Sequence, residues 1–284
     1  MGVFRRSIYK TPEQLRGMLE PGRITREALE AVRGAIRPGM TTLELDAIAE
    51  ASIRAAGAHP NFQLVPGYRH TICVSVNDEV VHGIPGERVL QPGDIVSVDC
   101  GAETEEGWNG DSAISIVLPN ADDPETVARH EELSRITEQS MWAGIASLAT
   151  ARNLGETGAA IEAYIEANPH ASTGEPLGIL RDYVGHGIGR KMHESPTLFH
   201  YATPQPGARV KPGLCVCVEP MMVIGDETVA VAEDDWTVVT VDGTSGAHWE
   251  HSVAVHDGGI WVLTASDGGA AGLAPFGVTP VPLS

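Results

Sequence analysis

Hydrophobic residues recur at helical spacing near the start of the chain and again in its middle. Thr11 has the character of an N-cap, and Pro12 and Glu13 suit the first turn of a helix. Thr41 opens a second, shorter helix in the same way. A long helix followed by a short one returns in the second half of the chain. The predicted helices cover 12–37, 41–57, 124–149 and 155–167.

Strand-like segments follow each pair of helices. They either alternate between apolar and polar residues or form short continuous apolar runs, and glycine or proline bounds most of them. Gly101 and Gly107 bracket a predicted hairpin, and an earlier short strand ends at His82. The other predicted strands cover 71–77, 90–99, 111–118, 183–184, 210–219, 236–241, 249–255 and 259–263.

One phrase occurs twice: a Pro-Gly turn, an apolar strand, and then a carboxylate. It spans 91–99 and 211–219, and alignment of the turns places Asp99 where Glu219 falls. We therefore predict a duplication, with α+β halves of about 8–120 and 121–264 related by a pseudo-twofold axis. The expected product is a single domain, 1–264, with a curved, mostly antiparallel sheet, helices on its outer face, and a site where the halves meet. Residues 265–284 are rich in Gly, Ala and Pro and predict a disordered tail.

The composition narrows the possible partners. The formal charge is −19, from 38 acidic and 19 basic residues, which disfavours nucleic acid and anionic membranes because both require clustered lysine and arginine. A solvated acidic surface is the simplest explanation of this charge. Residues 1–6 lack a following hydrophobic stretch, so no signal peptide is evident, and no run reaches the length of a membrane span. The four cysteines lie beside apolar residues and predict buried, reduced thiols in a cytoplasmic protein.

Four carboxylates and one histidine carry the candidate chemistry. The carboxylates lie near the ends of apolar strands, and four negative charges in one cleft cannot all ionise without positive charge nearby. Two divalent cations would balance them, and oxygen ligands with one imidazole suit manganese, iron or cobalt. The predicted ligands are Asp99, Asp111, His186, Glu219 and Glu250.

Each of these residues also has a simpler explanation. Asp99 and Asp111 lie beside glycine and are common turn formers. Glu250 would fit a surface strand, and His186 would fit a loop. Glu219 is harder to explain in this way, because the strand before it is apolar on both faces.

Several motifs, in order, resemble those of the type I methionine aminopeptidases of peptidase family M24. They are Val80-Val81-His82-Gly83-Ile84-Pro85, Gly185-His186-Gly187-Ile188-Gly189-Arg190-Lys191-Met192-His193-Glu194, Val218-Glu219-Pro220-Met221 and Trp249-Glu250-His251-Ser252. The resemblance runs from about 8 to 264. It implies the pita-bread fold and a dinuclear metal site made by the five residues named above.

The resemblance also implies an activity and roles for individual residues. A water or hydroxide bridging two metal ions (cobalt, manganese or iron) would attack the first peptide bond of a protein that begins with methionine and has a small second residue. Glu219 would act as general base and acid, and His193 would polarise the scissile carbonyl. His82 would hydrogen-bond the substrate's backbone amide or the departing nitrogen. Neutral buried histidines with backbone partners are the alternative for His82 and His193.

The family resemblance further implies a methionine pocket lined by Tyr68, Cys73 and Trp236, each of which has an ordinary core role as its alternative. The sequence departs from the family at Met192, where an aromatic residue is usual, and at His248, where glutamine is common. The segment between residues 62 and 72 is shorter than usual, and this bears on the placement of Tyr68.

Asp99 and Asp111 are twelve positions apart, one more than the family pattern. We expect the extra residue to be absorbed as a bulge in the acidic tip, 103–106. Without such a bulge, alternation along the strand would turn one aspartate away from the site.

Two other functions remain open on the sequence. One is a proline-directed aminopeptidase or creatinase-like hydrolase of the same fold, although such relatives usually carry an extra N-terminal domain. The other is a catalytically silent binding protein, which would be expected to lose metal ligands. The predicted partners are peptide and nascent-protein N-termini, with transient ribosome contact, and the predicted state is a monomer without nucleic-acid or membrane partners.

Overall fold

The first predicted long helix is divided in two in the computed structural model, which describes residues 7–283. Helix α1 (Pro12–Gly17) ends at Met18, and α2 (Leu19–Ala35) begins directly after it. A continuous helix would need the backbone N–H of Pro21 to bond the carbonyl of Gly17. Proline has no such group, and its ring collides with that carbonyl, so the chain restarts here.

The remaining predicted helices are confirmed with small shifts of their ends. They are α3 (Thr42–Ala55), α4 (Pro124–Ser147) and α5 (Leu154–Ala167). At α3, the Thr41 side chain accepts from the Glu44 N–H while the Glu44 side chain accepts from the Thr41 N–H, so two free donors of the first turn are satisfied.

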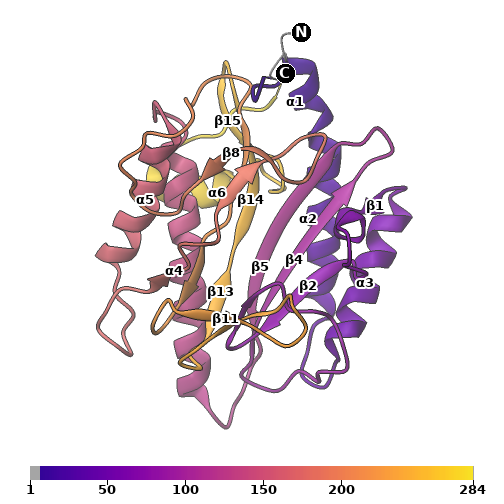
Figure 1. The fold of residues 1–284 in the computed structure, drawn as a ribbon, viewed down its shortest axis with the longest axis vertical. Helices are drawn as coiled ribbons and strands as arrows, with labels where there is room; N and C mark the ends of the chain where they lie inside the picture. Colours follow the sequence, from indigo (N-terminus) through magenta and orange to yellow (C-terminus); the bar gives the residue numbers. More distant parts are fainter. Residues whose placement is uncertain (1–6, 284) are drawn as a thin grey trace.

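A nine-stranded antiparallel sheet joins the two halves. Its order is β1-β4-β5-β14-β9-β7-β8, with β2 on β4 and β15 on β14. Its strands are β1 (His59–Pro60), β2 (Ile72–Val76), β4 (Ile95–Glu103), β5 (Asn109–Val117), β7 (Gly185–Gly187), β8 (Glu194–Leu198), β9 (Cys215–Val218), β14 (Glu250–His256) and β15 (Gly259–Val262). Figure 1 shows β5 and β14 side by side at the centre of the molecule.

Two small sheets and three short helices complete the described chain. One sheet has the order β13-β10-β6 and the other β11-β12-β3. Their strands are β3 (Glu79–Val81), β6 (Gly178–Ile179), β10 (Met221–Val223), β11 (Val229–Val231), β12 (Val238–Thr240) and β13 (Gly246–His248). The short helices are η1 (Asn61–Leu64), α6 (Ala270–Leu273) and η2 (Ala274–Phe276).

The two Pro-Gly turns have the same structure. The Asp94 N–H donates to the Gln91 carbonyl at 3.2 Å, and the Leu214 N–H donates to the Lys211 carbonyl at 3.2 Å. The glycines between them have φ of 89° (Gly93) and 98° (Gly213), a conformation that favours glycine. Strands β4 and β9 follow these turns and flank the central pair β5 and β14, so the predicted duplication is visible in the sheet order.

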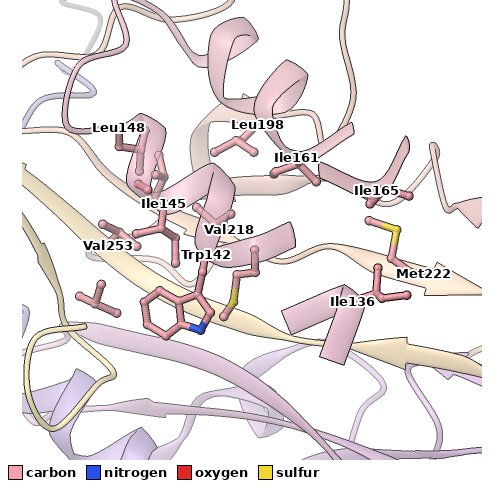
Figure 2. Close-up of a cluster of buried hydrophobic side chains, with 14 of the residues drawn as sticks. Ile136, Trp142, Ile145, Leu148, Ile161, Ile165, Leu198, Val218, Met222 and Val253 are labelled. Carbon is pink, nitrogen blue, oxygen red and sulfur yellow. The ribbon is translucent and has the colours of Figure 1, made fainter. Parts of the chain in front are cut away.

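The sheet is apolar on the face that meets the helices. Helices α2 and α3 pack on one half of it and α4 and α5 on the other (Figure 1). Figure 2 shows α4 and α5 side chains, among them Trp142 and Ile161, over Val218 and Val253 of the sheet. Because strand side chains alternate, burial of these residues against the helices sends their neighbours to the inner face.

The expected disordered tail is wrong. Helix α6 and η2 pack on α4, and Leu273 is 0% exposed in the same cluster as Trp142. At Gly272 a Cβ atom would lie 2.1 Å from the Trp142 indole, so the small residues that suggested disorder permit close approach to a large aromatic ring. Composition was misleading because Phe276 and Val278 pack with Leu273 on this cluster, and the Val281 N–H donates to the Ile260 carbonyl at 3.0 Å.

Helices long and apolar enough to span a bilayer do not occur among residues 7–283. All four cysteines are free and buried, as predicted. The prediction that no signal peptide is evident rests on residues 1–6, and these lie outside the described residues.

Truncating the buried side chain of the tail tests its packing. We expect Leu273→Ala to lower the free energy of unfolding by about 2–5 kcal/mol, as for other buried leucines, measured by urea denaturation. The exposed neighbour Ala274 gives the control, because Ala274→Ser should change stability by less than about 0.5 kcal/mol. If the Leu273 variant were as stable as the unaltered chain, Leu273 would not pack on the core and the tail would be disordered as first predicted.

Candidate metal centre

One row across the sheet brings three of the predicted site residues to the same face. Cys73 of β2 is opposite Asp99 of β4, Asp99 is opposite Ala113 of β5, and Ala113 is opposite Glu250 of β14. Directly opposed residues point to the same side of a sheet. Asp111 lies two positions from Ala113 and therefore shares that side.

The spacing of Asp99 and Asp111 needs no bulge in the ladder. The register of β4 and β5 is unbroken from Ile95↔Val117 to Glu103↔Asn109, with Gly101 opposite Asp111. A three-residue tip, 105–107, closes the hairpin, and Gly107 there has a φ of 76°. The expectation of a bulge within 103–106 is therefore wrong: the even spacing itself keeps both aspartates on the inner face.

His186 and Glu219 complete the centre from the second half. His186 on β7 places its Nε2 3.2 Å from Oε1 of Glu219 and 3.9 Å from Oδ2 of Asp111. Ligand atoms of Asp111, His186, Glu250 and Cys217 all lie within 4.8 Å of one another. The structure thus brings the five predicted ligands together and adds a thiol.

The carboxylates lack the partners that buried acids need. One oxygen each of Asp99, Asp111, Glu219 and Glu250 is buried without a hydrogen bond. Asp111 is 3% exposed and Glu250 2%. Such atoms are rare in native structures unless an ion or water satisfies them, so this donor set fits divalent cations.

The ionisation of these groups supports the same conclusion. Burial raises the pKa of Asp99 to about 7. Burial, followed by repulsion from neighbouring carboxylates, raises the pKa values of Asp111, Glu219 and Glu250 well above their usual range. Burial, followed by the nearby His193, lowers the pKa of His186 to about 4. A neutral imidazole beside carboxylates has a free nitrogen lone pair for a metal.

The two auxiliary histidines lie beside this centre. The rings of His186 and His193 meet edge to face with centroids 4.4 Å apart. Burial lowers the pKa of His193, and burial followed by the charge of His193 lowers that of His82. His82 has a φ of 61°, a strained conformation for a non-glycine residue that is most often found at functional sites.

The predicted methionine-pocket residues form one apolar cluster. Tyr68 and Cys73 are buried together, with Trp236 and Met192 packed against them. The Tyr68 hydroxyl donates to the Ile72 carbonyl at 2.7 Å, and its ring centroid lies 5.1 Å from that of Trp236. Because Cys73 is opposite Asp99 in the sheet, the cluster borders the carboxylates. Phe62 and Ile84, which were not predicted, also join this cluster.

Two further histidines contact Glu219. The Glu219 N–H donates to His200 Nε2 at 3.2 Å, and His248 Nε2 lies 4.0 Å from Glu219 Oε2. Burial lowers the pKa of both to about 3. His200 was not predicted, because its only signal is a histidine in a strand-like stretch, and His248 was predicted only as a departure from the family pattern.

Comparison with known proteins places the chain in a family. Residues 16–257 match Metallopeptidase family M24. Methionine aminopeptidase 1 of Bacillus subtilis is 42% identical over 257 residues, which are 90% of this chain and 98% of that protein. Methionine aminopeptidase 1 of Mycobacterium tuberculosis is 43% identical over 252 residues, 88% and 92% of the two chains. The chain belongs to family M24, among its methionine aminopeptidases.

Solved structures confirm the pita-bread fold of this family member. Methionine aminopeptidase from Thermotoga maritima aligns with a TM-score of 0.83 and 36% identity, over 91% of this chain and 99% of that one. Prolidase from Pyrococcus furiosus aligns with a TM-score of 0.67 and 19% identity, over 91% of this chain and 66% of that chain. The prolidase likeness shows the shared fold alone.

Removing one charge tests the repulsion within the centre. Asp111 has a raised pKa in the folded state, so at neutral pH the metal-free folded chain binds more protons than the unfolded chain, and stability falls as pH rises. We expect Asp111→Asn to stabilise the metal-free protein by about 1 kcal/mol or more, with the gain growing as the pH rises above about 4, the usual pKa of an aspartate. Thermal unfolding in chelator measures this.

The same variant should gain less stability than the unaltered chain when Mn²⁺ is added, since it has lost a ligand oxygen. Asp122→Asn, at an exposed aspartate, is the matched control and should behave like the unaltered chain. Equal midpoints for Asp111→Asn and the control at every pH would show that the carboxylates do not repel one another.

Proposed function

We propose that the chain removes the N-terminal methionine from nascent proteins and peptides whose second residue is small. The observation that carries this is a group of unsatisfied, buried carboxylates with a neutral imidazole, bordered by an apolar pocket, in a member of the methionine aminopeptidases. We propose two divalent metal ions (manganese, iron or cobalt) held by Asp99, Asp111, His186, Glu219 and Glu250.

The metal requirement follows from charge and donor type. When all four carboxylates are ionised, they carry four negative charges, and two dications neutralise this charge. When bound, such ions lower the pKa of a water molecule and polarise a carbonyl group. Mainly oxygen ligands with one nitrogen favour manganese, iron or cobalt over a thiolate-rich zinc site.

Glu219 is the proposed general base and acid. It takes a proton from the attacking water and returns it to the leaving amine. Its position is fixed from two sides, because its N–H donates to His200 and the strand that ends just before it, β9, pairs with β14. A carboxylate whose pKa is raised by burial and neighbouring charge accepts a proton more readily than a solvated one.

The auxiliary histidines are proposed to bind the reacting peptide unit. His193 lies beside His186 with its side chain partly exposed to solvent, and it is placed to donate a hydrogen bond to the scissile carbonyl oxygen. His82, held in a strained conformation near His193, is proposed to bond the substrate amide or the departing nitrogen.

Substrate choice is assigned to the apolar cluster. An unbranched thioether would pack among the rings of Tyr68 and Trp236 and beside Cys73, and Met192 would adapt to its shape. A cavity of about 1030 Å³ lined by His193 and Trp108 opens next to the centre, and we propose that the rest of the substrate chain leaves through it.

Peptide turnover tests the function. After chelation, we expect no activity, and after Mn²⁺, Fe²⁺ or Co²⁺ is restored separately, release of methionine from Met-Gly-Met, followed by amino-acid analysis. An Xaa-Pro peptide serves as the comparison because prolidases share the fold. Turnover of the Xaa-Pro peptide alone would reassign the chain to proline-directed hydrolysis, and turnover of neither would leave a silent binding protein.

Glu219→Gln tests the proposed base. We expect kcat to fall by about 10²–10⁴-fold while circular dichroism shows an intact fold, with bound metal measured in parallel to separate lost binding from lost catalysis. The exposed Glu166 of α5 provides the matched control, and Glu166→Gln should keep normal turnover. Near-normal kcat in the Glu219 variant would remove this residue from the mechanism.

The other predicted properties stay proposals. They are a cytoplasmic location, a monomeric state, and transient contact with ribosomes as the nascent N-terminus emerges. The net charge of −19 favours peptide over nucleic-acid partners.

A further inference from the structure

Cys217 differs from the other buried cysteines in its surroundings. Its Sγ lies with the ligand atoms of Asp111, His186 and Glu250 in a group no wider than 4.8 Å. By contrast, Cys215 on the same strand has Lys10 and Glu194 as its charged neighbours. Cys73 and Cys100 pack in two apolar clusters, and Cys217 shares a third with Cys215. Cys217 alone among the four belongs to this group of metal-ligating side chains.

The sheet register explains why the thiol faces the carboxylates. Val216 and Val218 of β9 pack with the cluster under α4 and α5, so Cys217 between them points to the inner face. It is opposite Ser252 of β14, and the Sγ and Oγ atoms are 3.5 Å apart. Glu250 is two positions from Ser252 and shares that face.

The surrounding oxygens indicate a ligand at this place. Asp111 Oδ1 and Glu250 Oε1 are buried without hydrogen bonds, and both side chains are more than nine-tenths buried. Ligand atoms that share one ion, with bonds of about 2.0–2.3 Å, lie within about 4.5 Å of one another. The observed group is close to that size.

We propose that Cys217 is a direct thiolate ligand of the metal ion bound by Asp111, His186 and Glu250. This inference rests on the proposed metal-dependent function. As the sulfur–metal bond forms, the thiol proton leaves to solvent. A soft sulfur donor among hard oxygens favours zinc, cobalt and iron(II) relative to manganese, so this centre selects its metal differently from one made of oxygen and nitrogen alone.

Cobalt absorption spectroscopy on the full chain tests the sulfur bond. After chelation, Co²⁺ is added to the unaltered chain, to Cys217→Ser and to the matched control Cys215→Ser, which alters a buried thiol two residues away on the same strand. We expect a near-ultraviolet sulfur-to-cobalt charge-transfer band in the unaltered chain and the control, and its loss in Cys217→Ser. A band of equal strength in all three, or in none, overturns the proposal.

X-ray absorption on the zinc-loaded unaltered chain gives a test that needs no variant. We expect a sulfur scatterer at about 2.3 Å from zinc, and a first shell of only oxygen and nitrogen overturns the proposal. Cys217→Thr replaces Cys217→Ser in the cobalt measurement if the serine variant does not fold.

Turnover of Met-Gly-Met in the same samples separates this inference from the proposed function. Turnover without a sulfur signal overturns Cys217 as a ligand and leaves the aminopeptidase function intact. A sulfur signal that depends on Cys217, without turnover of the peptide, supports the ligand and overturns the function.

Discussion

The burial of four carboxylates side by side on the inner face of one sheet is the constraint on which this structure depends. Each loses most of its water, and each raises the pKa of its neighbours. An unpaired buried charge costs several kcal/mol, which is a large part of the stability of an ordinary domain. Stability and metal binding are therefore linked in this protein, because an ion that binds only the folded state stabilises it by mass action.

The fold withstands this repulsion through the opposite face of the same strands. Valine and isoleucine alternate with the polar positions of β4, β5, β9 and β14 and pack under four helices. The inner face is also tied together by backbone contacts: the Ser252 hydroxyl donates to the Asp111 carbonyl at 2.7 Å and accepts from the Asp111 N–H at 3.2 Å. The apolar face supplies the free energy of folding that offsets the repulsion, and the strand register fixes where the carboxylates lie.

Much of this arrangement could be predicted from the sequence, because duplication and strand alternation are both local signals. The repeated Pro-Gly phrase located Asp99 and Glu219, and the helix caps located the starts of α1 and α3. Features that depend on contacts between residues distant in the sequence could not be predicted. The strands β6, β10 and β13 have only two or three residues each, too few for a period to show, and the packing of Leu273 depends on a ring more than a hundred positions earlier.

In the candidate site, too, residues within motifs could be predicted and residues placed by long-range contacts could not. Motifs identified its carboxylates and histidines, whereas Cys217 was predicted only as one of four buried thiols. Its place in the centre follows from its opposition to Ser252, a pairing that no local pattern reveals. His200 was missed for a similar reason: its contact is with the backbone of Glu219, nineteen positions away.

The central sheet can be completed only late in the synthesis of the chain, because it requires strand β14. This strand lies between β5 and β9 and joins the halves, yet it begins only at Glu250. A growing polypeptide that has not reached that point leaves one side of β5 without its hydrogen-bonding neighbour, and an open strand edge of this kind pairs readily with other chains. Synthesis that stops early would therefore give an aggregation-prone product rather than a half-active one, since neither half of the chain contains all four carboxylates of the centre.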